Sequence, residues 1–72
     1  MKKYNSGAPT GVISYQYGAG YISILFEGGH TYTYTYQSAG KVHVEQMKRL
    51  ADAQKGLNTY INQHHPVFAE KR

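Results

Sequence analysis

The stretch "FEGGHTYTYTY", residues 26 to 36, decides how this chain folds. Tyr32, Tyr34 and Tyr36 recur at a spacing of two with threonines between them, which is the period of a β-strand with two different faces. The adjacent Gly28-Gly29 pair favours a two-residue hairpin turn, because such turns need positive φ angles. The length of this turn determines which face of the sheet carries the tyrosine row.

A two-residue turn places Leu25 opposite Tyr32. The three tyrosines then share a face with Leu25, whereas the threonines share the other face with Ile22, Ile24 and Phe26. We expect the helical part of the chain to cover the isoleucine–phenylalanine face, because that face is pure hydrocarbon, and the tyrosines to line the open side. A three-residue loop would shift the pairing by one residue and move the tyrosines beside Phe26, into the core.

Two further strands precede the tyrosine row. Residues 12–17, "VISYQY", and 21–26, "YISILF", are rich in β-branched and aromatic residues, and "GAG" at 18–20 forms the turn between them. The third strand is predicted over 30–36. We expect Phe26 to be buried against the helix with the isoleucines.

A helix follows Gly40. Its apolar stripe recurs at helical spacing and consists of Val44, Met47, Leu50 and Ala51. Gly56 fits the left-handed position beyond the end of this helix. Asn58 fits the N-cap of a short second helix over 59–65, which Pro66 ends.

These elements predict an α+β fold. It is a three-stranded antiparallel β-meander covered on one face by a C-terminal helix, β-β-β-α, with a short final helix. Residues 1–11 contain Gly7, Pro9 and Gly11 and are predicted to be a flexible lead-in. The folded domain is expected over 12–65, and 66–72 are expected to be a tail.

Composition limits the classes of protein. Eight Lys and Arg residues stand against four Asp and Glu, a net charge of +4, with most of the excess near the two ends. The chain has no cysteine, which suits a reducing cytoplasm. No apolar segment follows Lys2-Lys3 as in a signal peptide, and no apolar run approaches the ~18 residues that span a bilayer. We therefore expect a cytoplasmic protein without membrane contact.

Catalytic, metal and cofactor sites are not indicated. Four scattered carboxylates and no nucleophile motif offer little to an enzyme. His64 and His65 are adjacent on a predicted helix and point about 100° apart, which is poor geometry for one ion. Gly18 to Gly20 lack the lysine and helix of a phosphate loop. We expect no enzyme activity, no metal and no cofactor.

The residues also resemble a known family. Phe26, Gly29, Tyr32 and Tyr34 form F-x-x-G-x-x-Y-x-Y, and a second motif, A-x-x-G-x-N-x-x-I, is formed by Ala53, Gly56, Asn58 and Ile61. In order and spacing, over about residues 12–64, these resemble the KTSC domain, found at the C-terminus of some lysyl-tRNA synthetases and as free-standing small bacterial and phage proteins. The chain departs from the family in two places. At 37–40 the family usually has Val-Pro, and the family has a serine before the glycine where this chain has Gln54-Lys55 before Gly56. The resemblance implies the fold, and RNA binding has been suggested for the family.

The tyrosine row allows three interpretations. The rings stack on bases of a single-stranded nucleic acid, or they pack across strands, or they form a protein or self-association interface. In the first interpretation Tyr32, Tyr34 and Tyr36 stack on bases. The phosphate contacts then come from Lys41, Lys48, Arg49 and Lys55.

The leading hypothesis is a small non-catalytic domain that binds RNA or another single-stranded nucleic acid. The alternative is a protein–protein interaction module, for instance a small phage or bacterial protein that docks on a larger complex or pairs with itself. The first or the third predicted strand must be a sheet edge, and neither carries a lysine or proline that would protect it. We therefore also expect weak homodimerisation.

Overall fold

The described part of the chain folds into a five-stranded antiparallel sheet covered on one face by helices. The computed structural model describes residues 1–5 and 11–72. The strands follow one another across the sheet in the order β1-β2-β3-β4-β5. In chain order, the elements are β1 (Lys2–Lys3), β2 (Val12–Gly18), β3 (Tyr21–Phe26), β4 (Thr31–Thr35), α1 (Tyr36–Ala39), α2 (Lys41–Ala53), α3 (Leu57–His64) and β5 (Glu70–Lys71). The α+β class is confirmed, and the three predicted strands form the centre of a larger sheet.

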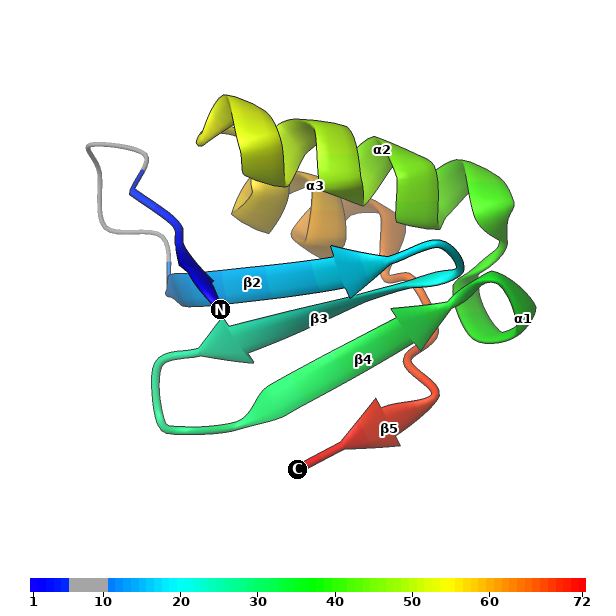
Figure 1. Cartoon of the computed structure of the whole chain (residues 1–72), viewed down its shortest axis with the longest axis horizontal. Helices are drawn as coiled ribbons and strands as arrows, with labels where there is room; N and C mark the ends of the chain where they lie inside the picture. The colour runs from blue at the N-terminus through cyan, green and yellow to red at the C-terminus, as the bar shows by residue number, and fades with distance from the viewer. Residues whose placement is uncertain (6–10) are drawn as a thin grey trace.

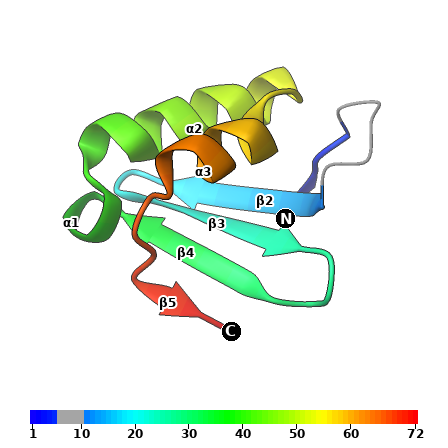
Figure 2. The same cartoon turned by 180° about the vertical axis from the view of Figure 1, so that it is seen from behind.

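The helices form one layer and the sheet the other. Helices α2 and α3 lie side by side over the same face of the sheet, and α1 is a single turn beside the end of β4 (Figure 1). Seen from behind, the segment after α3 descends past the sheet to β5, which lies beside β4 (Figure 2). No helix in the described part of the chain is long and apolar enough to cross a membrane.

The predicted hairpin register is wrong by one residue. Ile22 pairs with Tyr34 and Ile24 with Tyr32, so the tyrosines share the face of the isoleucines. The loop contains three residues, 27–29, because the Phe26 amide donates to the His30 carbonyl at 2.9 Å. Gly28 and Gly29 both adopt positive φ, at 98° and 86°. The glycine pair correctly predicted a tight turn, but the turn is one residue longer than expected.

Burial of apolar surface explains this register. With a three-residue loop, the isoleucines and the tyrosine rings all face α2 and α3, and burying a large side chain contributes about 1.5–3 kcal/mol. The open face carries the threonines with Ser23, Tyr21 and Leu25, and Ser23 Oγ lies 2.8 Å from Thr33 Oγ1 across it. The threonines, which need no helix to cover them, are therefore the residues that face away from the helices.

The core combines both sets of residues. Its buried members are Tyr4, Val12, Tyr15, Ile22, Ile24, Tyr34, Val44, Met47, Ala51 and Leu57. Burial of the isoleucines against Val44 and Met47 confirms that part of the predicted core. Phe26 and Leu50 are only half-buried and pack against it.

The third strand ends earlier than predicted because a short helix starts inside it. Thr35 Oγ1 accepts from the Ser38 amide, and the Thr35 amide donates to Ser38 Oγ, each at 3.0 Å. This reciprocal pair is a capping box, which satisfies amides at a helix start. It moves Tyr36 out of the strand and into α1.

The second helix also begins differently from the prediction. Gly56, at φ 80°, is the N-cap of α3, and Asn58 already lies inside the helix. Gln54 and Gly56 both take left-handed conformations between α2 and α3, so the glycine marks the connection as expected.

The chain ends belong to the sheet. Lys2 and Lys3 pair with Tyr15 and Ser14, and the Leu57 amide donates to the hydroxyl of buried Tyr4 at 3.1 Å. The fold therefore extends beyond the predicted 12–65. The remaining part of the predicted lead-in, residues 6–10, lies outside the described residues.

At the other edge, Glu70 and Lys71 pair with Thr33 and Tyr32. The two strands that were expected to be open edges are therefore each flanked by a short strand that carries lysine. Short, charged edge strands oppose edge-to-edge pairing. The reasoning behind the predicted homodimer does not apply to this sheet, and dimerisation itself stays a prediction.

Candidate functional site

The predicted stacking residues do not form an open platform. Tyr34 is 3% exposed and lies in the core beneath the helices. Tyr32 is half-buried, with its ring edge-on to Phe26 at 5.3 Å and to Phe68 at 4.8 Å between centroids. Lys71 Nζ lies 5.3 Å from the centre of the Tyr32 ring. The interpretation of the row as packing describes these two rings best.

Tyr36 and Lys48 are used inside the protein. Tyr36 Oη donates to Glu45 Oε2 at 2.6 Å, and Lys48 Nζ lies 2.8 Å from the same oxygen. The Lys48 side chain is only 12% exposed, donates to the Ala19 carbonyl, and lies near the rings of Tyr17 and Tyr36. The contacts with Lys48 and, next, with Tyr36 hold the pKa of the Glu45 carboxyl below its usual range.

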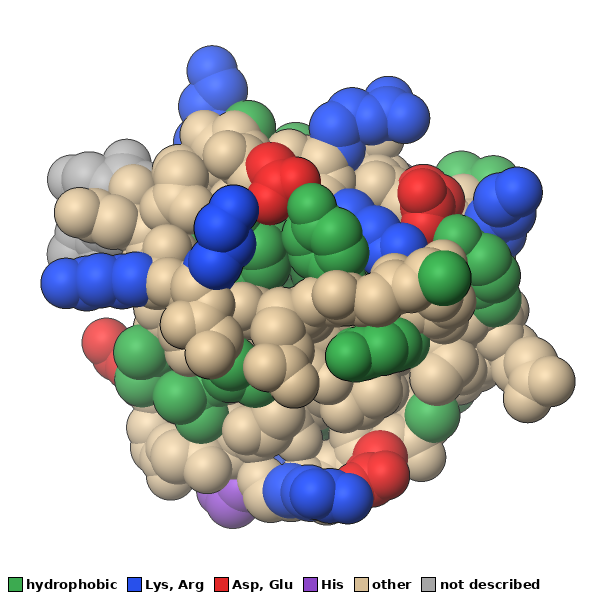
Figure 3. All heavy atoms as spheres, in the orientation of Figure 1, with side chains coloured by type: hydrophobic (Ala, Val, Ile, Leu, Met, Phe, Trp, Pro, Cys, Tyr) green, Lys and Arg blue, Asp and Glu red, His purple; other side chains and the backbone are tan. Residues whose placement is uncertain are grey.

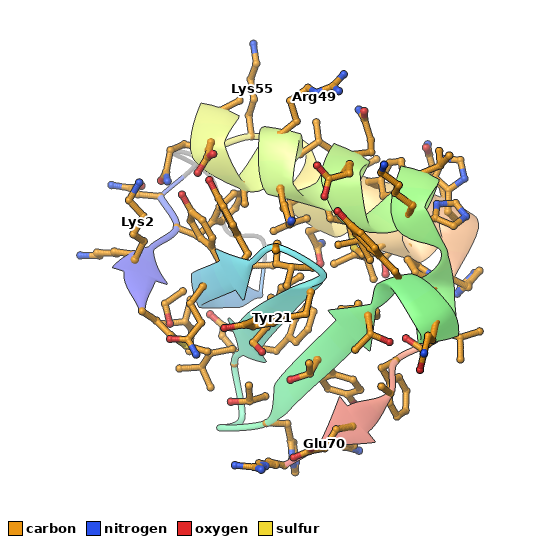
Figure 4. The ribbon with its side chains drawn as sticks, turned by 45° about the vertical axis from the view of Figure 1, so that its right-hand side comes forward. Lys2, Tyr21, Arg49, Lys55 and Glu70 are labelled. Atoms are coloured by element: carbon orange, nitrogen blue, oxygen red, sulfur yellow. The ribbon has the colours of Figure 1, made fainter. Side chains whose placement is uncertain are left out.

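The other predicted phosphate contacts are exposed. Lys41, Arg49 and Lys55 lie in or just after α2. Arg49 and Lys55 project away from the sheet (Figure 4). On the face drawn in Figure 3, the basic side chains are scattered, with acidic, hydrophobic and uncharged groups between them. The structure therefore brings Tyr36 and Lys48 together but does not gather the other predicted tyrosines and cations onto one surface.

An apolar groove lies elsewhere. It runs between the β3–β4 hairpin and the segment formed by α3 and the residues after it, and has a volume of about 580 Å³. It is lined by Phe26, Glu27, His30, Tyr32, Tyr34, Ile61, Asn62, His65, Pro66, Val67 and Phe68. Among the described residues, no Lys or Arg lines this apolar groove. Sequence reasoning missed it because its two walls are some thirty residues apart in the chain; the apolar pair Val67-Phe68 after Pro66 was the available signal.

Two tyrosine hydroxyls of the groove lack partners. Within the described residues, neither Tyr32 Oη nor Tyr34 Oη has a hydrogen-bond partner. Burial, with a smaller contribution from Tyr32, raises the pKa of Tyr34 to about 12, so its hydroxyl is protonated at neutral pH. The groove is therefore an apolar cleft with hydroxyl groups at its surface.

A second cluster fixes α2 to the sheet. Tyr15 Oη and Tyr17 Oη donate to the two oxygens of Asp52, at 2.9 and 2.6 Å. These hydrogen bonds lower the pKa of the Asp52 carboxyl, and burial with the neighbouring carboxylate raises the pKa of Tyr15 to about 12. Because both of its oxygens accept hydrogen bonds from phenols of β2, the Asp52 carboxylate holds α2 on the sheet.

The histidines fall into two places. His43 Nδ1 lies 2.6 Å from Tyr60 Oη, and the His43 and His64 rings are 5.5 Å apart between centroids. His30 and His65 line the apolar groove. No group of three or more potential metal-ligating side chains occurs in the described part of the chain.

Comparisons of the chain with protein-family models, with curated proteins and with solved structures found no match. The resemblance to the KTSC domain therefore stays a prediction, and function has to be argued from the groove and the surface charges.

Proposed function

We propose that the chain is a small non-catalytic protein-interaction module and that the apolar groove is its docking site. The observation that carries this proposal is the groove itself. Its volume of about 580 Å³ falls in the range of ~300–1,000 Å³ typical of ligand sites, and its walls combine apolar and aromatic side chains with a few polar groups.

Exposed apolar side chains support the same site. Val67 is 63% exposed and Phe68 43% exposed, and both line the groove. Clustered exposed apolar residues mark interaction sites, and aromatic residues are enriched in the centres of protein interfaces. The described lining contains Glu27 and no Lys or Arg, with Lys71 beside it on the Tyr32 ring, and this balance favours a protein partner over a phosphate backbone.

Selection from a displayed random-peptide library tests the proposal. Val67→Lys places a charge at the groove and should abolish enrichment of peptides that bind the wild type. Val42→Lys is the matched control, because Val42 is 80% exposed and lies outside the groove lining. Enriched peptides that bind both variants equally would show that the groove is not the docking site.

Binding of RNA or another single-stranded nucleic acid is the second candidate. The net charge of +4 and the exposed Lys41, Arg49 and Lys55 favour it, and the resemblance to the KTSC domain agrees with it. Its contacts would be electrostatic rather than a tyrosine stack.

A titration of labelled single-stranded RNA at two salt concentrations tests this candidate. Phosphate contacts make affinity fall steeply with salt, and replacing Lys41, Arg49 and Lys55 together by Gln should flatten that dependence. If the triple variant binds with the same affinity and the same salt dependence, these residues do not contact phosphate.

A further inference from the structure

The hydroxyl groups of the tyrosines divide into two sets. The hydroxyls of Tyr4, Tyr15, Tyr17, Tyr36 and Tyr60 all have partners within the protein. In the described part of the chain, those of Tyr32 and Tyr34 do not, and both residues line the apolar groove. The remaining tyrosine, Tyr21, lies on the open face of the sheet.

The Tyr34 hydroxyl reaches the groove. Every fully buried polar side-chain atom in the described residues has a hydrogen-bond partner, so this unpaired hydroxyl must touch accessible space. Tyr34 is 3% exposed and lines the groove, so we place its hydroxyl at this groove. Buried tyrosine hydroxyls normally have a partner, because leaving one unpaired is unfavourable. A polar group at the floor of an apolar groove favours ligands that bind it.

We propose that the groove takes an aromatic side chain with a hydrogen-bonding tip, the chemistry of tyrosine or tryptophan, from a partner protein, and that the Tyr34 hydroxyl bonds that tip. This inference rests on the proposed protein-docking function. The phenol both donates and accepts, so it pairs with an O–H or an N–H group.

The walls explain why the ligand is aromatic. The Tyr32 ring already packs edge-to-face with the rings of Phe26 and Phe68, at 5.3 and 4.8 Å between centroids. A further ring entering the groove continues this favoured arrangement. A nucleobase is also flat and polar, but it brings a phosphate, and the described lining offers the carboxylate of Glu27 and no Lys or Arg; the cation of Lys71 lies beside the lining, 5.3 Å from the centre of the Tyr32 ring.

The test uses two probes that differ by one hydroxyl, N-acetyl-tyrosinamide and N-acetyl-phenylalaninamide, titrated into the full chain and followed by amide NMR. An apolar tip leaves the Tyr34 hydroxyl unpaired, so the tyrosine probe should bind at least about fivefold more tightly. Tyr34→Phe should abolish this difference and retain the weaker binding. Tyr21→Phe, which removes a hydroxyl outside the groove, should leave the difference unchanged. If Tyr34→Phe fails to fold, nuclear Overhauser contacts between the bound tyrosine probe and the Tyr34 ring in the wild type replace it, and their absence would overturn the proposal.

The other outcomes separate the two proposals. Equal binding of both probes at the groove would overturn the role of the Tyr34 hydroxyl and leave the docking function standing. Failure of both probes to shift groove resonances would overturn both. If adenosine bound at the groove more tightly than either probe, the proposal would be overturned, and the ligand would be a nucleobase rather than a protein side chain.

Discussion

On the helix-covered face of the sheet, the tyrosine hydroxyls beside α2 and beside α3 differ in their hydrogen bonding. Beside α2, Tyr15 and Tyr17 both donate to Asp52, and the bonds fix the helix on the sheet. Beside α3, Tyr34 contributes its ring to the core while its hydroxyl stays without a partner in the described residues. The same residue type therefore stabilises the fold at one site and equips a groove for binding at the other.

Removing single hydroxyls tests this difference. Tyr15→Phe loses a hydrogen bond to a charged group, which is worth about 1.5–3 kcal/mol, and should lower the free energy of unfolding by up to that amount. Tyr34→Phe loses no internal bond and should leave stability unchanged or slightly raised. Urea unfolding of the two variants measures the contrast, and a larger loss in Tyr34→Phe than in Tyr15→Phe would show that the Tyr34 hydroxyl is bonded within the protein.

At the level of elements, the β3–β4 loop determines which residues become core. Gly29 has a φ of 86°, and a Cβ added there would meet no atom within 4 Å. Gly29→Ala therefore changes backbone strain alone and should cost about 1–2 kcal/mol. Gly20→Ala is the control, because no positive φ is involved and the nearest atom lies at 4.0 Å. Thermal melts that are equal for the two variants would contradict the strain argument.

The sequence predicted elements better than their pairing. β3 was predicted at its observed bounds, and the apolar stripe placed α2 correctly, because strong periodicity reflects a single buried face. The predicted hairpin register was wrong because Gly-Gly fits turns of two or three residues. Which turn length is adopted depends on burial of the tyrosine rings by helices that are distant in the chain. The two-residue strands β1 and β5 are too short to carry a pattern, and the groove exists only after 26–34 and 61–68 come together.

The C-terminal strand has a protective role that deletion can reveal. The Thr31 amide donates to the Arg72 carbonyl and the Arg72 amide to the Thr31 carbonyl, each at 2.8 Å. Removing 70–72 leaves these groups unpaired on β4, whose own side chains include no lysine, so the variant should self-associate through this edge. Sedimentation velocity measures it against the full chain. A folded deletion variant that stays monomeric at high concentration would show that β5 is not needed to protect the edge.

For the molecule as a whole, tyrosines and carboxylates set stability at both ends of the pH scale. The folded state lowers the pKa of Asp52 and of Glu45, through hydrogen bonds from Tyr17 and Tyr15 and from Lys48 and Tyr36. It raises the pKa of Tyr15 and of Tyr34 from 10.0 to about 12. The carboxylates thus favour the folded state when charged, and the phenols favour it when neutral.

The acid side follows from the carboxyl groups. Because the unfolded chain binds these protons at a higher pH than the folded protein, the stabilisation is complete above the ordinary values of 3.8 and 4.5 and is lost as pH falls through the lower folded pKa values. Asp52→Asn should make urea stability less dependent on pH as the pH falls through and below 3.8, the ordinary pKa of an aspartate. An unchanged acid slope in that variant would show that Asp52 does not couple protonation to folding.

The alkaline side has the opposite sign. Between pH 10 and about 12, the unfolded chain has lost the phenol protons of Tyr15 and Tyr34 while the folded protein still holds them, so the free energy of unfolding should fall as pH rises. The Tyr34 contribution comes mainly from burial of its ring and hydroxyl, and that of Tyr15 from burial together with Asp52. Urea unfolding from pH 9 to 12, with absorbance of tyrosinate followed in parallel, measures both effects. Tyr34→Phe should flatten the alkaline fall, whereas Tyr21→Phe should not, because Tyr21 lies on the open face of the sheet. If the free energy of unfolding falls equally with rising pH in the two variants, the Tyr34 hydroxyl is as accessible as a surface phenol and the core position of Tyr34 is disproved.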